Sequence, residues 1–128
     1  SNHSTDKPYE TTLHFLIEKG EKTLLYATDG AWLLNIEHHI IGKKILDAIV
    51  FDATIGDIEQ GSDCIFEHNS IDMVRLMVAT MLKTGRLRED APVFLTHLAR
   101  TMHERQALLE ISLKYPLIPC FDGMKASI

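Results

Sequence analysis

Apolar residues occur along this chain in short runs and in spaced stripes, and the change between the two patterns predicts the order of strands and helices. Residues 13–17 and 23–26 form two short apolar runs, separated by the polar segment 18–22. Gly20 within that segment supplies a turn. The start of the chain is therefore expected to form an antiparallel hairpin.

The stretch after the hairpin combines a helical stripe with a buried strand. Leu33, Ile36 and Ile40 keep a helical spacing, which predicts a first helix. Residues 46–51 are a continuous apolar run, which predicts a buried strand. Residues 52–67 are expected to form a long loop, and loops of that length inside compact domains are usually functional.

Two more helices and another strand are expected in the second half. A helix begins near Asn69 or Ser70 and ends before Gly85, with an apolar stripe that consists of Val74, Met77, Val78 and Met81. Residues 93–95 form a strand. The segment 101–104 has the pattern of a capping box, which predicts the start of a third helix. The residues that this helix is expected to bury are Leu108, Leu109 and Ile111.

The chain ends with a short strand between Pro116 and Pro119, placed at a sheet edge because proline cannot donate to the ladder. Strands that alternate with helices in this way indicate an α/β layer. A length of 128 residues with 45% hydrophobic and 24% charged residues is typical of one globular domain. Residues 1–8 are interpreted as a tag remnant or disordered start, and residues 9–128 as the domain.

Charge and cysteine content narrow the function classes. The net charge of −5 argues against bulk nucleic-acid binding, so a phosphate-bearing substrate would have to be held by metal ions or a few local cations. No apolar stretch is long enough to predict a membrane span. Cys64 and Cys120 show no disulfide or zinc pattern, which favours a reducing, cytoplasmic compartment and free buried thiols.

Two apolar runs end on residues that can bind a metal. Asp29 follows the run at 24–28, and His97 follows the run at 93–96. Side chains just past the strand ends of an α/β sheet project into a shared crevice, so a carboxylate and an imidazole can converge there. The structural alternative makes Asp29 a helix N-cap and lets His97 hydrogen-bond the loop around Arg100.

Five segments in series carry a resemblance to a known family. They are YATDG at 26–30, LDAIVFDATIGD at 46–57, EHNS at 67–70, FLTHLART at 94–101 and PCFDGM at 119–124. The series resembles the C-terminal half of metallo-β-lactamase-superfamily hydrolases, in the branch of ribonuclease Z and the carbon-phosphorus-lyase-associated phosphodiesterases. The resemblance runs from about Leu13 to Ile128 and implies half of a four-layer αββα sandwich: a mixed sheet with helices on one face.

The resemblance also implies a metal site and a proton donor. It makes Asp29 the bridge between two divalent ions, with zinc favoured and manganese or iron as alternatives, and it makes His97 a ligand of one ion. His68 matches a histidine that protonates the leaving oxygen, and Asp52 matches the acidic residue that orients it. Where the family has Gly before that histidine, this chain has Glu67. The structural alternative is that His68 and Asp52 form a simple helix-start pair.

One motif of the family is missing. The signature H-x-H-x-D-H belongs to the N-terminal half, and the adjacent pair His38 and His39 cannot replace it, because neighbouring residues point about 100° apart on a helix. The chain is therefore interpreted as half of a metal-dependent hydrolase that cleaves phosphodiesters when intact and is inactive alone. Hydrolysis of a thioester or lactone, a non-catalytic binding module, and a receiver-like phosphoacceptor domain are the alternatives.

Half of a sandwich would leave one face of its sheet uncovered, which predicts either a homodimer or an association with the missing N-terminal half. The candidates for this face are Val50, Phe94, Leu16 and Leu25. The other histidines are not assigned to the site. His103 is interpreted as a first-turn helix residue, and the ones interpreted as surface or tag-proximal groups are His3, His14, His38 and His39.

Overall fold

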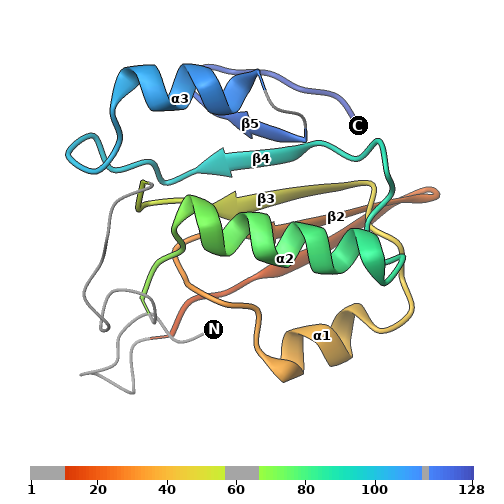
Figure 1. The fold of residues 1–128 in the computed structure, drawn as a ribbon. Coiled ribbons are helices and arrows are strands. Elements are labelled where there is room, and N and C mark those ends of the chain that lie inside the picture. Colours follow the sequence, from red (N-terminus) through yellow and green to blue (C-terminus); the bar gives the residue numbers. More distant parts are fainter. Residues whose placement is uncertain (1–10, 57–66, 114–115) are drawn as a thin grey trace.

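The computed structural model describes residues 11–56, 67–113 and 116–128, which form a mixed five-stranded sheet with three helices (Figure 1). In chain order the elements are β1 (Phe15–Lys19), β2 (Lys22–Ala27), α1 (Asn35–Ile41), β3 (Ala48–Asp52), α2 (Ile71–Lys83), β4 (Val93–Thr96), α3 (Arg105–Ser112) and β5 (Leu117–Pro119). The strands lie in the sheet in the same order. β1 and β2 form the predicted antiparallel hairpin, and every other pairing is parallel.

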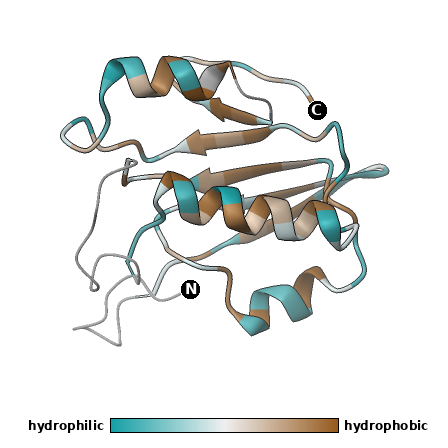
Figure 2. Cartoon of the chain, in the orientation of Figure 1, coloured by the Kyte–Doolittle hydropathy of each residue, from teal (hydrophilic) through white to brown (hydrophobic). Residues whose placement is uncertain are grey.

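One face of the sheet is covered by the helices. In register, Leu25 of β2 lies beside Ile49 of β3, which lies beside Val93 of β4, and all three are buried in one core. The α2 side chains that are buried are Ile71, Met73, Val74, Met77, Val78 and Met81. Figure 2 shows apolar strands behind helices that carry both polar and apolar residues. The α/β layer predicted from periodicity is confirmed.

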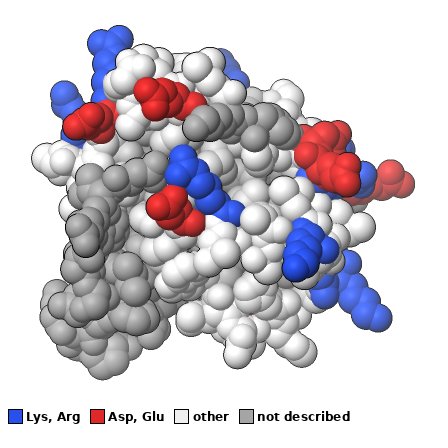
Figure 3. Space-filling view, viewed as in Figure 1, with Lys and Arg blue, Asp and Glu red and all other residues white. Residues whose placement is uncertain are grey.

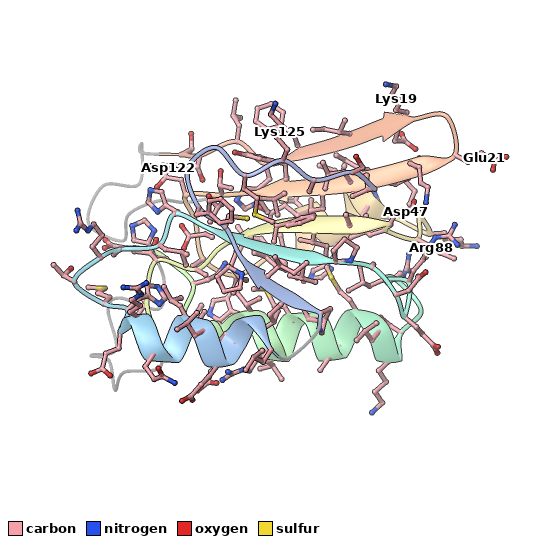
Figure 4. The ribbon with its side chains drawn as sticks, turned by 90° about the horizontal axis from the view of Figure 1, so that it is seen from above. Lys19, Glu21, Asp47, Arg88, Asp122 and Lys125 are labelled. Carbon is pink, nitrogen blue, oxygen red and sulfur yellow. The ribbon has the colours of Figure 1, made fainter. Side chains whose placement is uncertain are left out.

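The opposite face of the sheet is covered only in part, by the C-terminal tail (residues 120–128). Figure 4 shows this tail running across the face away from α2 and α3, with Asp122 and Lys125 marking its course. Of the candidates for this face, Val50 and Phe94 do line the space beneath the tail. Leu16 and Leu25 were wrongly placed, because their register pairs them on the helix side.

The second helix agrees with its prediction in both ends. The Ser70 hydroxyl accepts a hydrogen bond from the Met73 backbone N–H, which caps the first turn. Gly85 follows with φ +67°, a left-handed conformation that terminates helices at little cost for glycine. This cap fixes the position of His68, which stands two residues before it.

The first helix differs from its prediction. It starts only at Asn35, and its buried residues are Glu37 and Ile41, whereas Ile36 and Ile40 are exposed. The apolar spacing in the sequence therefore marks the outer side of this helix. The inner side of α1 instead carries a polar contact, in which His14 Nδ1 lies 2.8 Å from Glu37 Oε1. Glu37 therefore occupies an inner position that an apolar residue would normally take.

The contact with Glu37 also corrects the interpretation of His14 as a surface or tag-proximal group. Its side chain is only 5% exposed. Burial lowers the pKa of the imidazole, and the neighbouring Glu37 carboxylate opposes that shift. His14 therefore joins the segment before β1 to α1.

The third helix begins at Arg105, three residues later than the capping-box pattern predicts, because Thr101 would be the N-cap in that pattern. Glu104 is the N-cap residue, and residues 99–102 form a turn in which the Met102 N–H donates to the Ala99 carbonyl. Ile111 is buried as expected, and Leu109 is exposed. The capping-box prediction was wrong because this turn competes for the same residues.

No helix among the described residues is long and apolar enough to cross a membrane. The predicted tag remnant at residues 1–8 and most of the predicted loop at 52–67, with Cys64, lie outside the described residues.

Candidate metal centre

The four residues singled out from the sequence come together at one end of the sheet. Asp29 follows β2, Asp52 ends β3 and His97 follows β4, so three neighbouring parallel strands each place one residue at their carboxyl end. His68 comes from the segment before α2. Each residue offers a ligand-type atom, and these atoms all lie within 4.8 Å of one another. We call these four residues the His/Asp cluster.

The backbone at two cluster residues is strained. Asp29 has φ +57° and His97 has φ +58°, and these are the only non-glycine residues with positive φ in the described part of the chain. The left-handed conformation costs roughly 1–2 kcal/mol for most residues, less for Asp or Asn. His97 directly follows β4, and Asp29 stands two residues after the end of β2. Strain of this kind gathers at functional sites, where the surrounding structure holds it in place.

Asp52 is the buried centre of the cluster. Its side chain has 0% exposure. One carboxylate oxygen accepts hydrogen bonds from the N–H groups of Thr54 at 2.9 Å and Asn69 at 3.2 Å. The other accepts from the Gly30 N–H at 3.3 Å. With backbone donors from the segment after β2 and from both ends of the β3–α2 connection, this carboxylate joins the segments that carry the rest of the site.

His68 is held by Asp52. Its Nδ1 lies 3.0 Å from Asp52 Oδ2. That hydrogen bond raises the pKa of the imidazole, although partial burial opposes the shift. The ring stacks on the ring of His97, with centroids 5.2 Å apart. The Asp52 carboxylate therefore holds the His68 ring in position and contacts it at Nδ1.

The two ring nitrogens of His97 face three groups. Nδ1 lies 2.7 Å from the Thr54 hydroxyl oxygen and 3.3 Å from Asp52 Oδ2, whereas Nε2 lies 3.6 Å from Asp29 Oδ1. Histidines that bind metals in proteins usually give their second ring nitrogen to a carboxylate or another acceptor in this way. The side chains of His97 and Asp29 are about half exposed, at 46% and 45%.

The donor set of the cluster fits a divalent ion. Two ligands that share one ion, with bonds of roughly 2.0–2.1 Å at a tetrahedral angle, lie about 3.4 Å apart. The separation of 3.6 Å between His97 Nε2 and Asp29 Oδ1 is close to that value. Imidazole nitrogen with carboxylate oxygen suits zinc, manganese and iron. The arrangement can therefore hold an ion between the ends of β2 and β4.

Three nearby residues escaped the sequence analysis. The Thr54 hydroxyl stands between the two imidazoles, 3.2 Å from His68 Nδ1. Asn69 is fully buried, and its side-chain amide has no hydrogen-bond partner among the described residues. His103, wrongly interpreted as a plain helix residue, precedes α3, and its Nε2 lies 2.7 Å from the Ala53 carbonyl oxygen. Polar residues of these types are common in loops, so nothing in the sequence distinguishes them.

Close packing supports the same loop. A Cβ on Gly56 would clash with the Met102 carbonyl, so only glycine fits there without movement. The turn at residues 99–102, which precedes α3, thus packs against the segment that carries Asp52 and Thr54.

A cavity of about 550 Å³ adjoins the cluster. The residues that line it are Thr54, Thr96, His97, Leu98, Ala99, Cys120, Phe121 and Asp122. No lysine or arginine is among them. The Cys120 thiol is partly buried, and this burial raises its pKa. The cavity is therefore a mixed polar and apolar space with an imidazole at its wall.

A scan of protein-family models finds no match to this chain, and a search of curated proteins finds none either. What is established is an α/β domain with a mixed five-stranded sheet and a His/Asp cluster that can hold metal.

Proposed function

We propose that this chain is the C-terminal half of a metal-dependent hydrolase of the metallo-β-lactamase type, which cleaves phosphodiesters when the N-terminal half is present. The observation that carries the proposal is the convergence of Asp29, Asp52, His68 and His97 at the carboxyl ends of three parallel strands. Ligand sites in open α/β sheets form at that edge. The five sequence motifs that resemble the family supply the remaining support.

Two cluster residues act as metal ligands in this proposal. Asp29 offers two oxygens that can serve different ions, and His97 offers Nε2 while Thr54 and Asp52 face its Nδ1. Bound divalent ions would lower the pKa of a water molecule and offset the negative charge of the phosphate. The surroundings of His97 hold its ring in one orientation.

The other two cluster residues act as a proton-transfer pair. Asp52 holds His68 through Nδ1 at 3.0 Å, and no bulk solvent reaches that carboxylate. A fixed imidazole beside a reacting oxygen can donate a proton to it. His68 would protonate the leaving oxygen as the phosphorus–oxygen bond breaks, and the attacking water would supply the new oxygen on phosphorus. Asp52 is a positioning residue for this step.

The cavity beside His97 is the proposed place for the leaving group. None of the described residues that line it is lysine or arginine, so the phosphate beside it would depend on the metal for its charge compensation. This agrees with the net charge of −5, which offers no field for polyanions. Thioesters and lactones remain the alternative substrates, because the residues that would choose between them belong to the other half.

A binding-module function is the second candidate, and the uncovered sheet face favours it. Phe15, Ile17 and Tyr26 are exposed on that face by 51%, 48% and 39%. An apolar face of this kind fits a second sheet, either the missing half or a second copy of this chain. Assembly alone would then be the role of the chain, and the cluster would be structural.

A metal titration distinguishes the two candidates. In the isolated chain we expect weak binding of Co²⁺, a visible substitute for zinc, because two firm ligands are fewer than the three that catalytic zinc sites usually have. Asp29→Asn should abolish the absorption bands of bound Co²⁺. Asp122→Asn, which changes an exposed carboxylate in the same cavity but outside the cluster, should leave them unchanged.

Activity gives the second arm of this test. The isolated chain should be nearly inert towards bis(p-nitrophenyl) phosphate, whereas the protein with both halves should turn it over and lose that turnover in Asp29→Ala or His97→Ala. Normal turnover in either variant would contradict the assignment. Co²⁺ binding that Asp29→Asn does not change would show that the cluster is structural.

A further inference from the structure

A second cavity lies on the helix side of the molecule, at a distance in the fold from the strand ends that carry the His/Asp cluster. It is a groove of about 440 Å³ between α1 and α2. The residues that line it are Trp32, Leu33, His38, Ile41, Gly42, Leu76, Met77, Thr80, Met81, Thr84 and Arg86. We call it the α1/α2 groove. Its volume lies within the range of roughly 300–1,000 Å³ that small-molecule sites occupy.

The groove combines apolar walls with the cationic side chain of Arg86. Trp32, Met77 and Met81 supply apolar surface, and the guanidinium of Arg86 lies just beyond the end of α2. Among the described residues that line the groove, none is aspartate or glutamate. In Figure 3, charged side chains lie at the upper and right-hand margins and in one group near the centre, and the surface over α1 is largely uncharged.

The fold explains the position of the Arg86 backbone but not that of its side chain. Its Nη1 is buried, yet it has no hydrogen-bond partner among the described residues. An end-of-helix arginine commonly binds the last carbonyls of its helix, but here only the Arg86 backbone makes such contacts, through N–H to the Met81 carbonyl. An enclosed guanidinium nitrogen without an acceptor costs free energy, which an anionic ligand would recover.

We propose that the α1/α2 groove binds a small carboxylate with an apolar tail, whose head group pairs with Arg86 and whose tail lies along Trp32, Met77 and Met81. The planar guanidinium matches a carboxylate in shape and charge. Methionine side chains adapt to tails of varied shape. The groove is separate from the proposed hydrolase site, and it would act whether or not that proposal holds.

The chain contains a built-in reporter for this binding. Trp32 is its only tryptophan, and it lines the groove. Titration with decanoate, below the concentration at which it forms micelles, should shift the Trp32 fluorescence in a saturable way. Two ligands with the same tail serve as comparisons: 1-decanol, which is neutral, and decyltrimethylammonium, which is a cation. Both should bind at least about tenfold more weakly, because a hydrogen bond to a charged group contributes roughly 1.5–3 kcal/mol.

Four variants assign the binding to the groove. Arg86→Met should lower the affinity for decanoate to the level of decanol, whereas Lys83→Met, which removes an α2 cation outside the groove, should have no effect. Thr80→Phe should fill the groove from its exposed rim and weaken the binding of decanoate and of decanol. Asp29→Ala should leave decanoate binding unchanged. Circular dichroism of each variant establishes that it is folded.

Other outcomes would overturn the proposal. Equal affinity for the three ligands, which share one tail, would mean that the groove is only an apolar surface. Decanoate binding that survives Arg86→Met would place the carboxylate elsewhere. Sedimentation with phosphatidylglycerol vesicles that depends on Arg86, without saturable decanoate binding, would assign the cation to a membrane surface in place of a soluble carboxylate.

Discussion

The backbone conformation at Asp29 and His97 is unfavourable for stability, and these two residues are the proposed metal ligands. Both residues hold the left-handed conformation, which most side chains adopt only at a cost. A strained residue at the end of a strand is a poor choice for stability alone. Its presence at both proposed ligand positions agrees with a site that is maintained for binding.

Glycine and alanine substitutions at these two positions should therefore differ in their effect on stability, although both should remove the metal ligand. Asp29→Gly and His97→Gly should each be about 1 kcal/mol more stable than the matching alanine variant, because glycine adopts positive φ without strain. Thermal unfolding should show the difference as a few degrees in Tm. All four variants should lose Co²⁺ binding. Equal Tm values for the glycine and alanine forms would contradict the left-handed assignment.

At the scale of elements, the end of the sheet opposite the cluster is held by an ion network around Asp47. The residue is buried just before β3, and its carboxylate lies 3.2 Å from Lys22 Nζ and 2.7 Å from Arg88 Nε. The Thr23 N–H also donates to it at 2.9 Å. Figure 4 shows Asp47 and Arg88 together, far from Asp122 at the cluster end. The network joins the hairpin, β3 and the segment before β4.

Asp47→Asn should lower the free energy of unfolding by about 1–2 kcal/mol at neutral pH, because it removes a charge that accepts several hydrogen bonds. The Thr23 hydrogen bond, together with Lys22 and Arg88, holds the pKa of Asp47 below its usual value. A lowered folded-state pKa gives stability above the unfolded pKa near 4 that is lost as the pH falls through the folded pKa. Urea unfolding of both proteins should therefore converge below about pH 4. A constant difference from pH 7 to pH 3 would contradict this.

The elements also show why the sequence predicted some features and not others. The hairpin, α2 and β4 depend on local patterns such as Gly20 and the Ser70 cap, which the sequence displays directly. The inner side of α1 depends on Glu37 meeting His14 from a distant segment, so its apolar spacing was misleading. Asp29 and His97 were found because they stand at strand ends, whereas Thr54 joins the site only through folded contacts.

At the scale of the whole molecule, the sheet face that the C-terminal tail leaves exposed is available for association with a second copy of the chain. We expect the isolated chain to form a twofold dimer through this face at tens of micromolar. Ile17→Glu should make it monomeric, because a carboxylate buried between two sheets would have no partner. Leu113→Glu, at an apolar residue that is 85% exposed at the end of α3, is the matched control and should leave the dimer intact. Light scattering measures both, and a monomeric parent chain would refute the dimer.

The order of the strands has a consequence for how this chain reaches its fold. In the described part of the chain, strands that follow one another in the sequence are also neighbours in the sheet, so none of these strands is inserted between two that precede it. Each new strand finds its template already present at the growing edge. The sheet can therefore be built in the order of synthesis, from the hairpin towards β5. The cluster would be completed late on this route, when the segment after β4 brings His97 to residues that the earlier strands have already placed.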